Sequence, residues 1–137
     1  MTTARDIMTT DVTCVGEHDT LAEAARRMRD LGVGALPICG DDDRVKGMLT
    51  DRDIVVRCIA DGGDPASVEA GSFGQAENVT VGADDDVATL LATMKEHAVR
   101  RVPVIDKHDL VGIVSQADVA RSIDDDLVGD LVASISD

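Results

Sequence analysis

Gly47-Met-Leu-Thr-Asp-Arg-Asp53 indicates the architecture of the chain, because Gly112-Ile-Val-Ser-Gln-Ala-Asp118 repeats its pattern 65 residues later. Each stretch has a glycine within an apolar run, then a hydroxyl side chain, then an aspartate three residues further on. Upstream the correspondence continues at an offset of 66, which pairs Pro37 with Pro103, because the second copy lacks one residue of the intervening turn. An internal repeat of this length indicates a fold built from two similar units.

Each copy is predicted to fold in the order strand, helix, strand, strand, helix. Short β-branched and apolar runs mark the strands, at residues 12–15, 35–39 and 45–49 in the first copy and 79–81, 102–105 and 110–114 in the second. The prolines Pro37 and Pro103 favour edge or irregular positions within their strands. The last helix of each copy is expected to begin near Asp51 or Gln116.

The first helix of copy one carries clear boundary signals. Thr20 has capping-box spacing to Glu23, and Gly32 suits the left-handed position at a helix end. Apolar residues recur between them at the spacing of one helical face, namely Leu21, Ala24, Ala25, Met28 and Leu31.

The two copies predict an α+β fold in which βαββα repeats pack about a pseudo-twofold axis, because neither copy is large enough to bury its apolar face alone. The expected boundaries are 1–60 for repeat one with the N-terminal segment, 61–78 for a linker, 79–123 for repeat two and 124–137 for an acidic tail. The predicted core includes Leu21, Met28, Leu36, Val87, Met94 and Val102.

The composition narrows the set of partners. The 137 residues carry a formal net charge of −14, contain no Trp or Tyr, and have Phe73 as the only Phe. An acidic surface repels nucleic-acid backbones and anionic membranes, and the lack of rings removes the platforms on which bases stack. No apolar run is long enough to span a bilayer, and the N-terminus lacks a signal-peptide pattern. We therefore expect a cytoplasmic protein that binds neither nucleic acid nor membranes.

The repeat and its motifs resemble the tandem CBS domain pair, or Bateman module. The resemblance rests on Leu36-Pro-Ile38 and Gly47–Asp53 in copy one, and on Val102-Pro-Val-Ile-Asp106 and Gly112–Asp118 in copy two, and covers about residues 4–123. It implies a non-catalytic regulatory or stress-linked module that forms a homodimer. It also implies an adenosyl ligand such as AMP, ADP, ATP or S-adenosylmethionine, with no cofactor required.

In ligand-binding members of that family, a Ser or Thr after the third strand and an Asp three residues later contact the ligand. Here these residues are Thr50 with Asp53, and Ser115 with Asp118. A carboxylate accepts hydrogen bonds from ribose hydroxyls, and a hydroxyl at a helix N-terminus attracts phosphate. The same spacing also describes a capping box, which satisfies only backbone donors. The sequence leaves both interpretations open.

The resemblance assigns two further pairs of positions. Arg100 and Arg101 stand where basic residues point toward phosphates, and adjacent arginines supply bidentate donors; the alternative is two solvated surface side chains. The first copy has Gly34-Ala35 at that place, so the second copy is predicted to hold the better site. Thr13 and Val79 match positions whose backbone meets an adenine ring.

The cysteines and histidines do not by themselves define a site. Cys14 and Cys39 end the first two strands of copy one, which the connection makes parallel neighbours, so a disulfide and two free thiols of a reducing cytosol both remain open. Cys58 is expected to be a packing residue.

His18, His97 and His108 are dispersed and do not suggest the converging ligands of a zinc site. The three Asp runs, 41–43, 84–86 and 124–126, lack calcium-loop spacing, and no metal site is predicted.

No nucleophile, base and orienting residue fall on aligned elements, so an enzyme is not expected. The alternative to ligand sensing is a ligand-free CBS scaffold that acts through protein–protein contacts or through its redox state.

Overall fold

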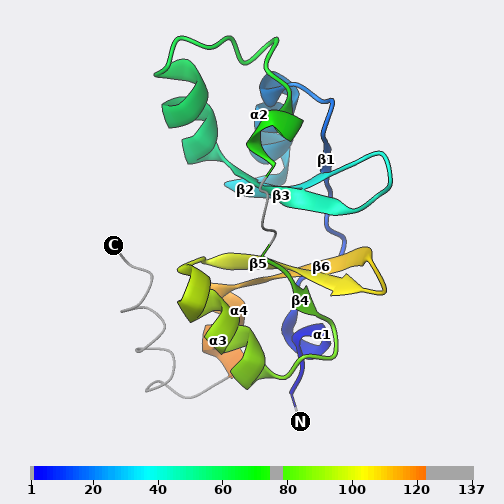
Figure 1. The fold of residues 1–137 in the computed structure, drawn as a ribbon. Coiled ribbons are helices and arrows are strands. Elements are labelled where there is room, and N and C mark those ends of the chain that lie inside the picture. The colour runs from blue at the N-terminus through cyan, green and yellow to red at the C-terminus, as the bar shows by residue number, and fades with distance from the viewer. Residues whose placement is uncertain (1, 75–78, 123–137) are drawn as a thin grey trace. The chain divides into compact units, whose positions relative to one another are not determined.

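The computed structural model describes residues 2–74 and 79–122 and divides the chain into two compact units (Figure 1). The first unit is Thr13–Asn78, and the second joins Met1–Val12 to the chain from Val79 onward. Each unit has its own three-stranded sheet and helices, so the predicted α+β class with two repeats is confirmed. The pseudo-twofold axis stays a prediction, and the expected acidic tail at 124–137 lies outside the described residues.

The first unit follows the predicted order and ends in one additional turn. Its elements are β1 (Val15–Gly16), α2 (Leu21–Leu31), β2 (Ala35–Cys39), β3 (Val45–Thr50), the π-helical segment η1 (Asp53–Ile59) and the 3-10 turn η2 (Ala70–Phe73).

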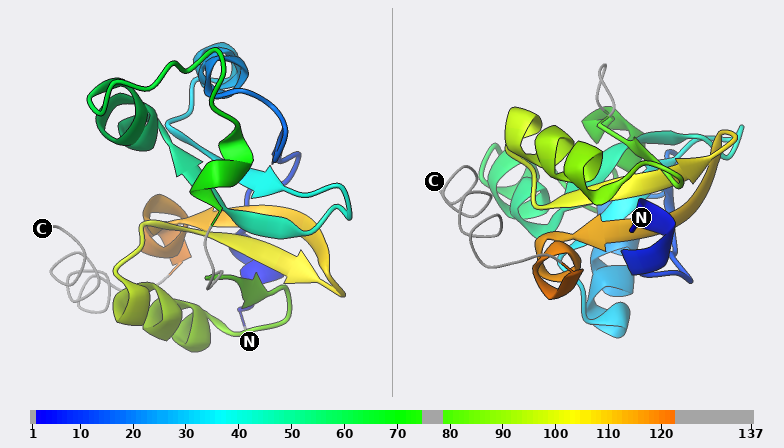
Figure 2. Two further views of the ribbon diagram at one scale, coloured as in Figure 1. Left: turned by 45° about the horizontal axis from the view of Figure 1, so that its top comes forward. Right: turned by 90° about the horizontal axis from the view of Figure 1, so that it is seen from below.

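The second unit repeats this order after a short N-terminal helix. Its elements are α1 (Ala4–Ile7), β4 (Val81–Gly82), α3 (Val87–His97), β5 (Arg101–Asp106), β6 (Asp109–Ser115) and α4 (Gln116–Ser122). The three helices described in this unit, α1, α3 and α4, cover the same face of the β4–β5–β6 sheet (Figure 2). None of the helices in the described part of the chain is long and apolar enough to cross a bilayer.

The caps of α2 and α3 correspond. At the N-termini, the Thr20 hydroxyl and the Asp86 carboxylate each accept the backbone N–H three residues on, at 3.2 and 2.8 Å. At the C-termini, the chain turns through a left-handed residue, which is Gly32 with φ +68° in α2 and Ala98 with φ +52° in α3. The predicted boundaries of α2 are therefore confirmed.

Each sheet has its second strand in the middle. Strand β2 pairs in parallel with β1 and antiparallel with β3. The pairing with β1 involves only Ile38 and Cys39, so at Pro37 the central strand has one paired edge, like an edge strand. The expected strands at 12–15 and 79–81 are shorter and begin later, at Val15 and Val81, because only these last residues meet a neighbouring strand.

The units exchange their first helical segments, and the predicted domain boundaries stay predictions. The Ala70 and Gly71 N–H groups, within the expected linker, donate to the Asp19 and Glu17 carbonyls at 2.7 and 2.8 Å. At an offset of 66, the Ala4 and Arg5 N–H groups donate to the Asp85 and Ala83 carbonyls, both at 2.9 Å. By these contacts, the segment before Thr13 packs in the second unit, and η2 packs in the first.

Each unit buries a core between its sheet and helices, and the core is aliphatic except for Phe73 in the first unit. Five of the six residues predicted to be buried are buried, namely Leu21, Met28, Leu36, Met94 and Val102. Val87 is only partly buried. The segment at Val68, whose carbonyl accepts the Leu21 N–H, covers the start of α2, whereas Thr2 provides the corresponding contact to Val87.

The predicted apolar face of α2 is too wide. Leu21, Ala24 and Met28 are buried, but Ala25 is exposed and Leu31 is 52% exposed. The buried stripe therefore consists of Leu21, Ala24 and Met28, and Leu31 lies on the outer surface of the first unit.

Candidate functional site

The strand-to-helix step of each repeat is a reciprocal capping box. In the first unit, Asp53 Oδ2 accepts the Thr50 N–H and the Thr50 hydroxyl accepts the Asp53 N–H, both at 3.0 Å. In the second unit, Asp118 Oδ2 accepts the Ser115 N–H at 2.9 Å and the Ser115 hydroxyl accepts the Asp118 N–H at 3.2 Å. The structural interpretation left open by the sequence is therefore realised in both repeats.

The two repeats differ in the contact made by the second carboxylate oxygen of this aspartate. Asp118 is 5% exposed, and its Oδ1 is bonded by Nη2 of Arg121 on the next turn of α4. Asp53 is more exposed, and its Oδ1 lies 3.5 Å from Arg57 Nη1. Sequence reasoning missed both arginines, although their spacings of three and four residues place them on the same helical face as the aspartates.

The positions of the predicted phosphate contacts also differ between repeats. Arg100 and Arg101 are exposed at the start of β5, and the Arg100 carbonyl accepts the Gln116 N–H at 2.8 Å. In the first unit the Gly34 carbonyl accepts the Asp51 N–H at 2.9 Å. A Cβ on Gly34 would lie 3.1 Å from Asp51 Oδ2, so this place carries negative charge in repeat one and positive charge in repeat two.

The predicted adenine-contact residues lie at the starts of the two units. Thr13 is exposed and precedes β1, and Val79 is half-buried and packs against the second core. They belong to different units, so their roles stay predictions.

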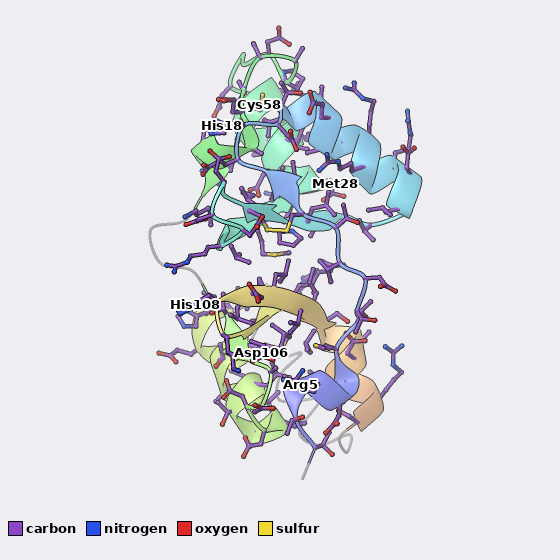
Figure 3. All side chains as sticks on the ribbon, turned by 90° about the vertical axis from the view of Figure 1, so that its right-hand side faces the viewer. Arg5, His18, Met28, Cys58, Asp106 and His108 are labelled. Carbon is purple, nitrogen blue, oxygen red and sulfur yellow. A yellow bond between two sulfur atoms is a disulfide. The ribbon has the colours of Figure 1, made fainter. Side chains whose placement is uncertain are left out.

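Cys14 and Cys39 are joined by a disulfide, with Cα atoms 5.8 Å apart, at the parallel pairing of β1 and β2 (Figure 3). The Cys14 carbonyl accepts a hydrogen bond from Arg27 Nη1 at 2.6 Å. The same Arg27 nitrogen lies 3.3 Å from Asp19 Oδ2. Cys58 is buried with a free thiol, in agreement with the packing role expected for it.

The three histidines are not equivalent. His97 and His108 are exposed, as expected for surface residues. His18 is also exposed, but it lies among three carboxylates, those of Glu17, Asp41 and Glu69. The ion pairs of His18 raise its pKa above the ordinary value of 6.5, and the Glu69 side chain is the largest cause, followed by Asp41. The sequence analysis missed this cluster because its members come from separate segments.

The two repeats, their capping boxes and their paired sheets define a class that sequence comparison identifies. The CBS domain family matches residues 4–59 and 71–125, and the chain belongs to that family. It is a CBS-pair protein, a regulatory class.

The relatives are similar over almost the whole chain. Hypoxic response protein 1 of Mycobacterium tuberculosis is 53% identical over 135 residues, covering 98% of this chain and 94% of that protein. The motifs Ala4–Met8, Thr13–His18 and Gly34–Arg44 predict a similarity to that protein, and the match over 135 residues confirms it. The CBS domain-containing protein YhcV of Bacillus subtilis is 34% identical over 137 residues, covering 99% and 96%.

Solved structures show the same fold. A crystal structure of hypoxic response protein I with two coordinated zinc ions superposes with a TM-score of 0.83 at 56% identity, covering 90% of this chain and 100% of that one. CBSX2 in complex with AMP superposes with a TM-score of 0.74 at 21% identity, covering 89% and 96%.

Proposed function

We propose that this chain is a non-catalytic regulatory module whose second repeat senses an adenosyl ligand. The observation that carries the proposal is the charge difference between the matched positions. Repeat two places Arg100 where repeat one has Gly34, and Gln116 where repeat one has the Asp51 carboxylate. An anionic ligand is attracted to the first arrangement and repelled by the second.

The contacts in the second repeat follow from the same residues. Asp118 accepts hydrogen bonds from ribose hydroxyls, Ser115 and the start of α4 face the phosphate, and Arg100 and Arg101 bind phosphate oxygens. Thr50 and Asp53 form a weaker site, and Thr13 and Val79 contact the base through their backbones. The AMP complex of CBSX2 supports the choice of an adenosyl ligand, because that protein has the same fold.

Calorimetric titration with adenosine, AMP, ADP, ATP and S-adenosylmethionine tests this function. The double variant Arg100→Gln/Arg101→Gln is expected to bind AMP and ATP at least about tenfold more weakly, while adenosine changes little, since only phosphates use the arginines. Arg44→Gln, an exposed arginine on the β2–β3 turn, is the matched control. Failure of every adenosyl compound to bind at millimolar concentration would instead support the ligand-free scaffold acting through protein contacts or redox state.

A homodimer is the working form that we propose. The first unit exposes large apolar side chains on and beside α2 and η1, namely Leu31, Val33, Val55, Val56 and Ile59. Because each copy carries a net charge of −14, two copies associate favourably only through an uncharged surface. Sedimentation of the wild type and of Val55→Glu/Ile59→Glu tests this, with the variant expected to be monomeric.

A divalent metal is the second ligand that we infer. The solved structure of hypoxic response protein I holds two zinc ions, and zinc is bound by imidazole, thiolate and carboxylate groups. Zinc therefore belongs in the ligand panel beside the adenosyl compounds.

We propose the cytoplasm as the compartment of this protein, as the sequence predicts, and fractionation of cells is the test.

A further inference from the structure

His18 presents its two ring nitrogens to different carboxylates. Nε2 lies 3.5 Å from Glu17 Oε1 and 3.4 Å from Asp41 Oδ2, whereas Nδ1 lies 3.5 Å from Glu69 Oε1. The candidate ligand atoms of Glu17, His18 and Asp41 all lie within 4.8 Å of one another.

Backbone contacts hold the segments that supply these side chains. Glu17 and His18 follow β1, Asp41 follows β2, and Glu69 precedes η2. The Glu17 N–H donates to the Cys39 carbonyl at 2.9 Å, and the Glu17 carbonyl accepts the Gly71 N–H at 2.8 Å. The Cys14–Cys39 disulfide links the same two strands, so the cluster stands on a fixed framework although its side chains face solvent.

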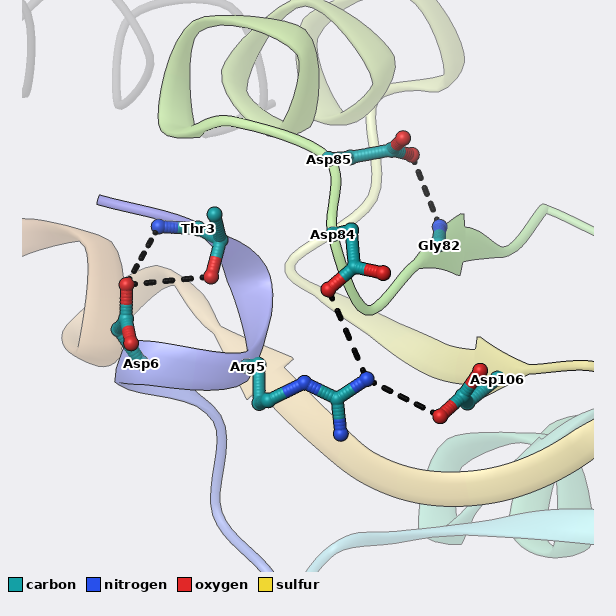
Figure 4. Close-up of polar contacts among 7 residues, drawn as sticks. All are labelled: Thr3, Arg5, Asp6, Gly82, Asp84, Asp85 and Asp106. Carbon is teal, nitrogen blue, oxygen red and sulfur yellow. Dashed lines mark hydrogen bonds and ion pairs between the residues drawn. The ribbon is translucent and has the colours of Figure 1, made fainter. Parts of the chain in front are cut away.

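The second repeat shows what this position requires. There an arginine forms ion pairs with two carboxylates. Arg5 Nη2 lies 3.0 Å from Asp106 Oδ2 and 3.6 Å from Asp84 Oδ1 (Figure 4). At the offset of 66, Asp84 corresponds to His18 and Arg5 corresponds to Gly71.

The first repeat has no room for that arginine. A Cβ on Gly71 would lie 2.7 Å from the Glu17 carbonyl oxygen. Among the ion pairs of the described residues, none brings a lysine or arginine to Glu17, Asp41 or Glu69. Three carboxylates therefore surround one imidazole, and a single proton on His18 balances only one of their charges.

We propose that Glu17, His18 and Asp41 bind one zinc ion, which takes the place that the Arg5 guanidinium has in the other repeat. In a tetrahedral site with bonds of about 2.0–2.1 Å, neighbouring ligand atoms are about 3.4 Å apart, which matches the separations from His18 Nε2 to Glu17 and Asp41.

Glu69 completes the site from the far side of the ring. A metal-bound histidine usually donates its other N–H to a carboxylate, which fixes the ring and strengthens the ligand, and Glu69 faces Nδ1. Water fills the fourth position. The inference rests on the metal binding proposed above and gives it a location, and it is independent of the adenosyl ligand.

Zinc titration of chelator-treated protein against a chromophoric zinc indicator tests the site, with the disulfide kept oxidised. We expect His18→Gln to weaken the tightest zinc site by more than about tenfold and Glu69→Gln by about tenfold, as the loss of an outer-shell carboxylate does. His97→Gln, an exposed histidine on α3, is expected to bind zinc like the wild type. X-ray absorption should show nitrogen and oxygen ligands without sulfur.

The outcomes separate this site from the wider metal proposal. Tight zinc binding that survives His18→Gln, or a sulfur ligand from Cys58, would place the metal elsewhere and overturn the assignment. A wild-type protein that binds no zinc would overturn both the site and the metal proposal. In neither case would the adenosyl proposal change.

Discussion

Arg121 bonds the oxygen of Asp118 that the proposed contact to a ribose would use. Asp118 gives Oδ2 to the capping box and Oδ1 to Nη2 of Arg121, which is 74% exposed at its side chain. A nucleotide in the second repeat therefore competes with an arginine of the same helix. The competitor is an exposed, flexible side chain, so it can be displaced without unfolding α4.

Removal of this competitor should improve ligand binding. We expect Arg121→Gln to bind adenosine more tightly than the wild type, although unfolding becomes easier by about 1–2 kcal/mol because a buried carboxylate loses a charged hydrogen bond. Calorimetry and urea denaturation measure the two effects. Arg29→Gln is the control, because its pairing with Asp30 is exposed on both sides and contributes little.

The proposed adenosyl site also predicts the effect of substituting Asp118 itself. Asp118→Ala should weaken every adenosyl ligand by about 1–3 kcal/mol, the usual loss for a hydrogen bond to a charged group. Equal binding by wild type and Asp118→Ala would leave Ser115 and Asp118 with the capping role alone.

Ala98 adopts a conformation that glycine tolerates better. It ends α3 with φ +52°, while Gly32 ends α2 with φ +68°. A left-handed backbone costs a residue with a Cβ roughly 1 kcal/mol, so Ala98→Gly should raise the free energy of unfolding by about 0.5–1 kcal/mol. The matched change Gly32→Ala should lower it by a similar amount. Chemical denaturation measures both, and destabilisation by Ala98→Gly would contradict the argument.

Met28 and Leu31 lie on the same helix with opposite burial. Met28 is 5% exposed within the first core and Leu31 is 52% exposed. Met28→Ala should therefore lower the free energy of unfolding by about 2–5 kcal/mol, while Leu31→Ala, measured in the monomeric Val55→Glu/Ile59→Glu background, should change it by less than about 0.5 kcal/mol. Equal effects of the two substitutions would refute the assignment of this helix face.

The repeat makes most of the fold predictable from sequence. Because Gly47–Asp53 and Gly112–Asp118 specify the same strand-to-helix step, the order of elements follows once one copy is interpreted. The exchange of α1 and η2 was missed because it joins residues far apart in sequence. Ala4 and Ala70 do stand at the repeat offset of 66, and extending the alignment upstream of Val15 would have found the correspondence.

The two candidate sites also differ in how far the sequence predicts them. The capping boxes at Thr50 and Ser115 depend on local spacing, so the sequence predicts their residues. The cluster at His18 depends on turns that bring Asp41 and Glu69 to one ring, and no spacing rule describes that convergence. One signal was available, because repeat one has Gly71 where repeat two has Arg5.

The pKa of His18 provides a direct test of its surroundings in metal-free protein. Its pKa is raised chiefly by the Glu69 side chain and also by Asp41 and Glu17, so Glu69→Gln should lower it. NMR titration of the imidazole measures the change, and Asp84→Asn in the other repeat is the control. Since the folded pKa is raised, the stabilisation from protonated His18 is complete below pH 6.5 and is lost as the pH rises through the folded value. A His18 pKa at or below 6.5 would contradict the observed ion pairs.

The disulfide should stabilise the first unit without being required for its fold. Cys14 and Cys39 are 25 residues apart, and closing a loop of that size typically contributes about 2–4 kcal/mol. The second repeat has Thr80 and Ile105 at the same positions and keeps the same strand pairing. The variant Cys14→Ser/Cys39→Ser should therefore fold, with its free energy of unfolding lowered by about that amount, and Cys58→Ser should leave the linkage intact.

Reduction of the disulfide should also weaken zinc binding. Glu17 and Asp41 follow the strands that Cys14 and Cys39 connect, so freeing these strands loosens two proposed ligands. We expect the Cys14→Ser/Cys39→Ser variant to bind zinc several-fold more weakly than wild type at equal pH. Peptide mass spectrometry without reductant should first show Cys14 linked to Cys39 and Cys58 free. Alkylation of all three thiols in the native protein would contradict the disulfide. Unchanged zinc affinity in the variant would show that zinc binding does not depend on the disulfide.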